Sequence, residues 1–390
     1  MMNHVRGCSM LGFLLCTLVL VCVSVTTTLA GESDPSNGAD DRAQQSNAGT
    51  KVDTQGATGF HPDVLVVVGA EGTSEYGEQF RLWEERWKDL AENSKARYRV
   101  IGTDEEGTQD RSQSQGGVTN AGKEGGPSND RSLLIESLRL MNRETEEPLW
   151  LILIGHGTYT RGVAKFNLRG PDISGAELAE HLATFSRPLI ALNFFSASGP
   201  FINAISGENR VVVSATKSGQ EQNYSRFGGY FIESLGDLSS DLDHDQRVSV
   251  LEAFLSASSQ TQAFYDSEQR LLTEHALVDD NGDKLGTPAV FFRGIRAVRK
   301  SKSSDSVDGR VSARASLGEE QGYAELTLTQ RQFRDQQERA LDDLVSRQAS
   351  LSRAEYLLEL EKILVPLAEI YAAEPDSDSN NDTVEDTTEQ

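Results

Sequence analysis

The sequence predicts a three-layer α/β fold in which helices cover both faces of a mostly parallel sheet. Four short runs consist almost entirely of apolar, often β-branched residues, as in strands buried on both faces: residues 63–69, 149–154, 189–195 and 210–215. Segments with apolar residues at spacings of three and four separate most of these runs, as helices do. Strands that alternate with helices form parallel sheets. The 390 residues suffice for one such domain with accessory segments.

The first sixty residues precede the predicted domain. Residues 1–30 are typical of a cleaved signal peptide, because Arg6 precedes an uncharged apolar run over residues 10–25 and small residues suited to cleavage follow. An uncleaved membrane anchor is the alternative, since the run approaches the shortest length that spans a bilayer. Residues 31–60 contain almost no large apolar residue and predict a disordered spacer.

Cysteine usage and charge narrow the class of protein. All three cysteines, Cys8, Cys16 and Cys22, lie within the N-terminal stretch. We therefore expect an exported protein (periplasmic, extracellular or lumenal) that folds without disulfide bonds. The net charge of −23 argues against a nucleic-acid partner, because phosphate contacts need a basic surface. No later run is apolar enough to span a bilayer, so no membrane partner is expected once the signal is removed.

The elements of the α/β domain follow in order along the chain. The helix after the first strand carries large apolar residues on one face, which predicts packing against the core. These residues are Phe80, Trp83, Trp87 and Leu90. A second strand is predicted over 98–102. Residues 103–130 are polar and Gly-rich, and they predict a lid or a disordered loop because they exceed a simple connection. Helices are predicted over 133–141 and 174–185, the latter opening with a capping box.

The predicted α/β domain covers residues 61–236. A helical extension over 237–300, centred on residues 249–276, follows it. Residues 301–325 are rich in Ser, Asp and Gly and predict a linker.

A helical hairpin over 326–373 is predicted beyond the linker. Its second helix carries an apolar stripe of Tyr356, Leu360, Ile363, Leu367 and Ile370. This stripe has to be buried, either within the chain or against a protein partner, and Pro366 predicts a kink. The acidic segment 374–390 predicts a disordered tail.

Two of the predicted strands lead into residues that can do chemistry. The strand over 149–154 leads into a Gly-His-Gly sequence centred on His156, and the strand over 189–195 leads into Ser196. Functional groups in parallel α/β sheets lie just beyond the carboxyl ends of strands. If these strands are neighbours, His156 and Ser196 face each other across a crevice suited to a peptide or protein ligand. The Gly157 N–H would then be free to donate to an oxyanion.

These motifs resemble the legumain-type branch of the caspase–hemoglobinase fold, which contains legumain, the caspases and gingipain-like enzymes. In that family one buried strand ends in His-Gly and the next in Ala-Cys-x-Ser-Gly. The matching residues here are 156–157 and 195–199. Residues 211–218 resemble the family's next strand and specificity-pocket segment. The resemblance covers roughly residues 62–236 and implies a caspase-like arrangement of the three layers.

The chain departs from the family pattern at the nucleophile. Ser196 occupies the cysteine position, and the supporting Asn of legumain has no counterpart in residues 69–72. A Cys–His dyad works without a third residue because a thiol ionises readily, whereas a serine hydroxyl needs a base held by a third group. We therefore expect a relative that has lost thiol catalysis and serves binding or scaffolding. The alternative is an active hydrolase with Ser196 as nucleophile, His156 as base, and the Gly157 and Ser196 N–H groups as oxyanion donors.

Residues 241–252 have the spacing of an EF-hand calcium loop. Side-chain oxygens fall at positions 1, 3, 5, 9 and 12, and position 7 supplies its carbonyl oxygen. The residues are Asp241, Asp243, Asp245, Ser249, Glu252 and, at position 7, Arg247. We expect calcium there in a structural role. Gln246 stands where Gly normally makes the turn, and the alternative is an Asp-rich helix N-terminus that favours carboxylates through the helix dipole.

Overall fold

The computed structural model describes residues 61–103, 129–301, 303–304, 306–317 and 326–372. The predicted signal peptide, spacer and acidic tail lie outside these residues, as does nearly all of the predicted lid or loop over 103–130.

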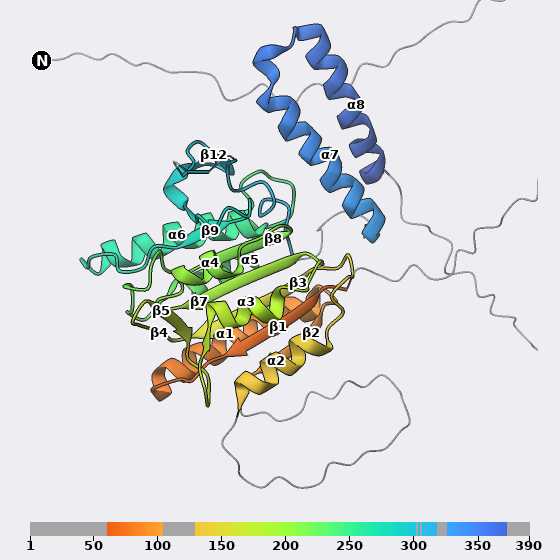
Figure 1. Ribbon diagram of the computed structural model, residues 1–390. Coiled ribbons are helices and arrows are strands. Elements are labelled where there is room, and N and C mark those ends of the chain that lie inside the picture. Colours follow the sequence, from red (N-terminus) through yellow and green to blue (C-terminus); the bar gives the residue numbers. More distant parts are fainter. Residues whose placement is uncertain (1–60, 104–128, 302, 305, 318–325, 373–390) are drawn as a thin grey trace, which may run out of the picture. The chain divides into compact units, whose positions relative to one another are not determined.

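A seven-stranded sheet forms the centre of the fold (Figure 1). Its strands are β1 (Asp63–Val68), β2 (Arg97–Ile101), β3 (Leu149–Gly155), β7 (Leu189–Phe195), β8 (Arg210–Ser214), β9 (Leu277–Asp279) and β10 (Thr287–Pro288). They lie in the order β10-β9-β8-β7-β3-β1-β2. The parallel strands are β1, β2, β3, β7 and β8. Strand β9 is antiparallel to β8, and β10 is antiparallel to β9. The predicted mostly parallel sheet is therefore confirmed.

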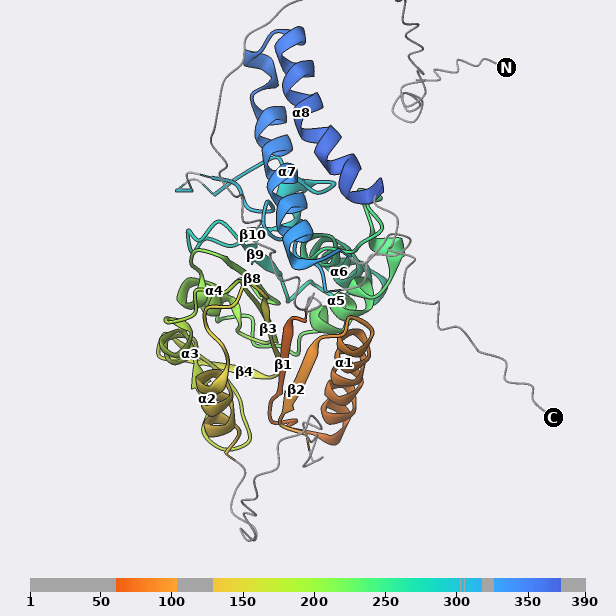
Figure 2. The same cartoon turned by 90° about the vertical axis from the view of Figure 1, so that its right-hand side faces the viewer.

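Helices cover both faces of the sheet, which confirms the predicted three layers (Figures 1 and 2). One face carries α1 (Ser74–Asn93), α5 (Phe227–Leu235) and α6 (Val250–Ser267), and the other carries α2 (Asp130–Leu140), α3 (Gly175–Leu182) and α4 (Gly199–Ile205). Successive residues of each strand point to opposite faces. In β1, Val64 and Val66 therefore pack on the α1 side, whereas Leu65 and Val67 pack on the α2 side.

Shorter elements surround the central sheet. They are β4 (Gly157–Thr160), β5 (Val163–Phe166), β6 (Ile173–Ser174), η1 (Leu238–Ser240), η2 (Ala289–Phe291), β11 (Phe292–Arg293), β12 (Arg296–Ala297) and η3 (Gln348–Ser350). Strands β4, β5 and β6 form an antiparallel sheet directly after His156, and the sequence did not predict it. The capping box predicted at the start of α3 is present, with Ser174 and Glu177 bonded reciprocally.

Three expectations about the region after α5 need correction. The helix predicted over 249–276 ends at Ser267. Strand β9 lies within the extension predicted over 237–300, yet it pairs with β8, so residue 236 does not mark the end of the sheet. The composition of residues 301–325 predicted a linker, but Asp308 and Ser312 are buried in the body of the protein. Short strands and buried polar loops carry little apolar periodicity, which is why the sequence pattern missed them.

The two C-terminal helices, α7 (Leu328–Ser346) and α8 (Arg353–Ala372), form the predicted hairpin (Figure 2). Ser352 and Glu355 bond each other reciprocally at the start of α8 and cap it. Ile363 of the predicted stripe is buried, so the stripe is covered at least in part within the chain. Pro366 lies inside α8, which continues past it. No helix in the described part of the chain has the length and apolar character needed to cross a bilayer.

Candidate functional site

The site begins where β3 and β7 end. These strands are neighbours, and Gly155 lies opposite Phe195 in the register. The residues that follow, His156 and Ser196, are consequently brought to the same edge of the sheet. The structure thus meets the condition on which the sequence-based site depended.

The Ser196 hydroxyl is bonded to a single residue. It accepts a hydrogen bond from the Gly157 N–H (3.0 Å) and donates one to the Gly157 carbonyl oxygen (3.1 Å). Ser196 is only 2% exposed. Gly157 has no space for a side chain, because a Cβ there would lie 2.1 Å from the Ser196 carbonyl oxygen. The two backbones are therefore packed directly against each other.

The His156 ring lies among aromatic side chains. Its centroid is 4.8 Å from the Tyr76 ring, 5.2 Å from Phe80 and 6.2 Å from Tyr224, each in an edge-on arrangement. Nε2 lies 3.2 Å from the Glu71 carbonyl oxygen and donates to it when protonated. Burial lowers the pKa of His156, and the hydrogen bond to Glu71 opposes this effect more weakly. The imidazole is thus held in its neutral form.

His156 and Ser196 lie at one edge of the sheet without a hydrogen bond between them in the described structure. Both hydrogen bonds of the Ser196 hydroxyl go to Gly157. A general base has to be within hydrogen-bond reach of the proton it removes. The Gly157 N–H, predicted as an oxyanion donor, already donates to the serine hydroxyl. In this geometry the Ser196 hydroxyl bonds Gly157 rather than His156, and the Gly157 N–H already has an acceptor.

The segment after β8 packs on the turn that follows Ser196. The Ala197 N–H donates to the Glu221 carbonyl oxygen (2.7 Å), and Ala197 adopts a left-handed conformation (φ 61°). The Thr216 N–H donates to the Ser198 hydroxyl (3.2 Å). The segment predicted to resemble a specificity pocket, Thr216 to Ser218, therefore lies beside the site and is fixed to it.

A histidine–carboxylate pair near the site was not found from the sequence. His275 contacts a Glu221 carboxylate oxygen through Nδ1 (2.5 Å), and its backbone N–H donates to the other (3.2 Å). The sequence pattern placed His275 inside a helix, but it lies in the connection before β9. No pairwise motif links positions so far apart in the chain, so only the tertiary structure could bring them together.

The candidate calcium loop brings together three of its six predicted ligands. Asp241, Asp243 and Glu252 each present an oxygen atom within 4.8 Å of the others. Gln246 adopts a left-handed conformation (φ 68°) at the position that Gly normally fills in such loops. Burial raises the pKa of Asp243 to about 7, with further increases from the carboxylates of Asp245 and Glu252. The loop thus concentrates negative charge around a small volume.

Several of the predicted ligands, Glu252 among them, have partners within the protein. The Asp245 carboxylate contacts the guanidinium of Arg247, which also lies 3.5 Å from Glu338 of α7. The Ser249 hydroxyl and Glu252 form a capping box at the start of α6. Both sequence interpretations of this segment, a calcium loop and an acidic helix N-terminus, therefore have a structural counterpart.

Two solved caspases match part of the chain at low sequence identity. The Drosophila initiator caspase Dronc is 14% identical with a TM-score of 0.35, and the match covers 67% of this chain and 96% of that one. Caspase-1 from Spodoptera frugiperda is 8% identical with a TM-score of 0.36, and the match covers 58% and 88% of the two chains. No protein-family model and no curated protein sequence matches the chain.

Proposed function

We propose that the chain is an exported, caspase- and legumain-like protein that has lost thiol catalysis and binds a peptide or protein ligand without cleaving it. The sequence supports this proposal through the His156-Gly157 and Ser196 motifs at successive strand ends. The sheet supports it through the pairing of β3 with β7, which places both motifs at one edge.

The paired hydrogen bonds between Ser196 and Gly157 carry the proposal. An alcohol is a weak nucleophile unless a base removes its proton. Here the hydroxyl donates its proton to a backbone carbonyl, which cannot act as that base. Burial of the hydroxyl further restricts the approach of an acyl group. This arrangement stabilises the junction of the two strands, as a structural residue does.

Turnover measurements on four forms of the protein test this proposal. The native chain, Ser196→Ala and His156→Ala should all lack activity on a broad pool of peptides, while retaining any ligand the native chain binds. Ser196→Cys separates two explanations, because peptidase activity in that variant would show a site that is intact apart from its nucleophile. Activity of the native chain that both alanine substitutions abolish would establish the serine-hydrolase alternative.

We also propose that residues 241–252 bind calcium in a structural role. The convergence of the Asp241, Asp243 and Glu252 oxygens favours this, because Ca²⁺ selects clusters of hard oxygen ligands. The left-handed Gln246 provides the turn that such a loop requires. On binding, the ion would offset the negative charge of Asp245 and Glu252, which adds to the effect of burial on the pKa of Asp243. Isothermal titration with CaCl₂ tests the proposal directly.

A further inference from the structure

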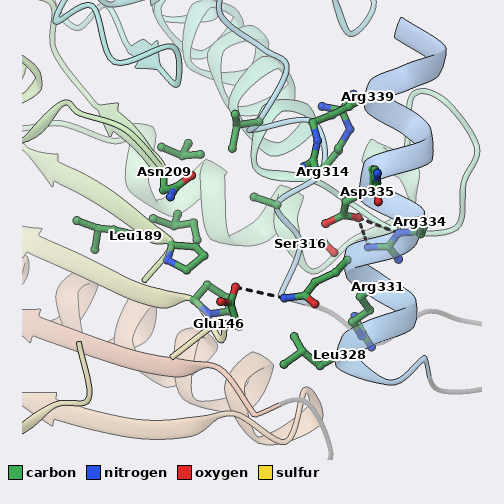
Figure 3. A pocket seen from close by; sticks show the side chains of 18 of the residues that line it. Glu146, Leu189, Asn209, Arg314, Ser316, Leu328, Arg331, Arg334, Asp335 and Arg339 are labelled. Carbon is green, nitrogen blue, oxygen red and sulfur yellow. Dashed lines mark hydrogen bonds and ion pairs between the residues drawn. The ribbon is translucent and has the colours of Figure 1, made fainter. Parts of the chain in front are cut away.

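A pocket of about 470 Å³ lies between the sheet and α7, at the edge opposite His156 (Figure 3). It lies where β3, β7 and β8 begin, whereas His156 and Ser196 follow the strand ends. One wall is largely apolar and comes from the sheet and its connections. That wall includes Pro148, Pro188, Leu189, Ile190 and Val211. The pocket is therefore independent of the site described above.

The opposite wall of the pocket is basic. Its arginines come from α7 and from the segment before it, and Figure 3 shows them around the opening: Arg314, Arg331, Arg334 and Arg339. Two carboxylates, Glu146 and Asp335, also line the pocket. Gln332 donates to Glu146 (3.2 Å) and Arg334 pairs with Asp335 (2.8 Å). Arg314 pairs with Glu338 and Asp342 of α7, so part of the positive charge of this wall is already balanced. The pocket is locally cationic in a protein whose net charge is −23.

Arg339 provides a charge that the described structure leaves unpaired. Its side chain is exposed and makes no ion pair with a described residue. The paired N–H groups of an arginine guanidinium bind a carboxylate. An aliphatic side chain of the same ligand can then contact the apolar wall beside it. The chemistry of the pocket thus favours an acidic peptide that contains an isolated apolar residue.

We propose that this pocket binds the acidic segment 374–390 of the same chain. That segment contains seven carboxylates: Glu374, Asp376, Asp378, Asp382, Glu385, Asp386 and Glu389. Val384 is its one large aliphatic residue and is followed by two of those carboxylates. Val384 would contact the apolar wall, and the flanking acids would pair with Arg339 and Arg331, which line the pocket.

The position of α8 places the start of the segment 374–390 near the pocket. Because α8 runs antiparallel to α7, its end at Ala372 returns toward Leu328, which begins α7 and lines the pocket. The residues beyond Ala372 could extend roughly 60 Å at about 3.3 Å per residue. A tethered segment of this length acts at an effective concentration on the order of 1 mM. Even weak pairing with the arginines would therefore fill the pocket.

A competition experiment on the full chain tests the proposal. The probe is a fluorescein-labelled synthetic peptide of residues 374–390, and its binding is followed by fluorescence anisotropy. It is titrated with the native chain and with a full-length variant in which Asp376, Asp378, Asp382, Glu385 and Asp386 are changed to the corresponding amides. The tethered segment should block the probe in the native chain, so the amide variant should bind it at least 10-fold more tightly.

Charge reversal identifies the binding surface. In the amide variant, Arg331→Glu together with Arg339→Glu should weaken the probe at least 10-fold. Arg161→Glu is the control, because Arg161 is an exposed arginine of the β4–β5 turn. Equal affinity of the native and amide chains would overturn the proposal in favour of an acidic segment from another protein. Absence of binding to either chain, or equal losses with the arginine reversals and the control, would also overturn it.

Discussion

The Ser196 hydroxyl and the Gly157 peptide group form a reciprocal pair of hydrogen bonds, one donated in each direction. This pair joins the end of β7, which leads into Ser196, to the residue that follows His156 after β3. The Ser196 hydroxyl thus links the two strand ends through hydrogen bonds. The relationship leads to the following expectations about stability and ionisation.

Ser196→Ala should destabilise the protein by about 1–3 kcal/mol, because the Gly157 N–H and carbonyl would both lose a buried partner. Urea denaturation measures the change. Ser239→Ala is the matched control, since the Ser239 hydroxyl bonds an exposed carboxylate. The control should change stability by less than about 0.5 kcal/mol. Equal effects of the two substitutions would contradict a structural role for Ser196.

The pKa of His156 should lie below the ordinary value of a histidine. Burial lowers its pKa, and no described carboxylate pairs with its ring. A two-dimensional NMR titration of the imidazole should give a midpoint below about 6.5. The neutral form should persist at pH 7, and folding stability attributable to His156 should fall as the pH drops through that range. A midpoint above 7 would instead indicate an acidic partner of the kind that supports a catalytic base.

Asp280→Ala should cost about 3 kcal/mol or more. The buried Asp280 carboxylate accepts hydrogen bonds from the backbone N–H groups of Gly309, Val311 and Ser312, which attach that segment to the body. Alanine would leave these donors without their partner. Asp283→Ala tests specificity, because Asp283 lies in the same turn but is less buried. Comparable losses of unfolding free energy in the two variants would argue against this anchoring role.

Asp308 should make the protein more stable in acid. Burial raises its pKa from 3.8 to about 7, against hydrogen bonds from Thr287 and Asp280 that lower it. Because the folded state binds the proton more tightly, stability should fall as the pH rises from about 4 to about 7. The full effect corresponds to about 4 kcal/mol. Urea denaturation at pH 4.5, 6 and 8 measures how the unfolding free energy depends on pH, and Asp308→Asn should reduce that dependence. An unchanged dependence in the variant would show that Asp308 is not the group responsible.

Calcium should raise the melting temperature if the loop over 241–252 binds it. Saturation at about 100 times the dissociation constant adds about 2.7 kcal/mol to the unfolding free energy. Asp241→Ala and Glu252→Gln should remove this gain, as measured by differential scanning fluorimetry with CaCl₂ and with EDTA. Asp237→Asn, which changes an exposed acid just before the loop, should retain it. A gain that survives substitution of both ligands would place the ion elsewhere.

The sequence predicted the central architecture because burial leaves a strong pattern in it. Strands β1, β3, β7 and β8 are nearly continuous apolar runs, and the α1 aromatics recur at helical spacing. Strand β9 has only three residues, and β4 has the sequence Gly-Thr-Tyr-Thr, so neither produces an apolar run. The buried segment around Asp308 is held by polar contacts, and its composition resembled that of a linker.

The candidate site was predicted in position but not in geometry. The sequence placed His156 and Ser196 at one edge only on the condition that their strands are neighbours, and the pairing of β3 with β7 meets that condition. The direction of the Ser196 hydrogen bonds depends on how closely Gly157 approaches, and no spacing rule gives that distance. The aromatic rings around His156 include Tyr76 and Tyr224 from distant segments, so only tertiary packing shows the environment that lowers the pKa of His156.

The reaction of the purified protein with a broad fluorophosphonate probe tests the central claim most directly, with His156→Ala measured alongside. Mass spectrometry identifies the labelled residue, and circular dichroism establishes that both samples are folded. The paired hydrogen bonds between Ser196 and Gly157 predict no labelling of Ser196 in either protein. Labelling of Ser196 that disappears in His156→Ala would contradict that prediction and identify a serine hydrolase.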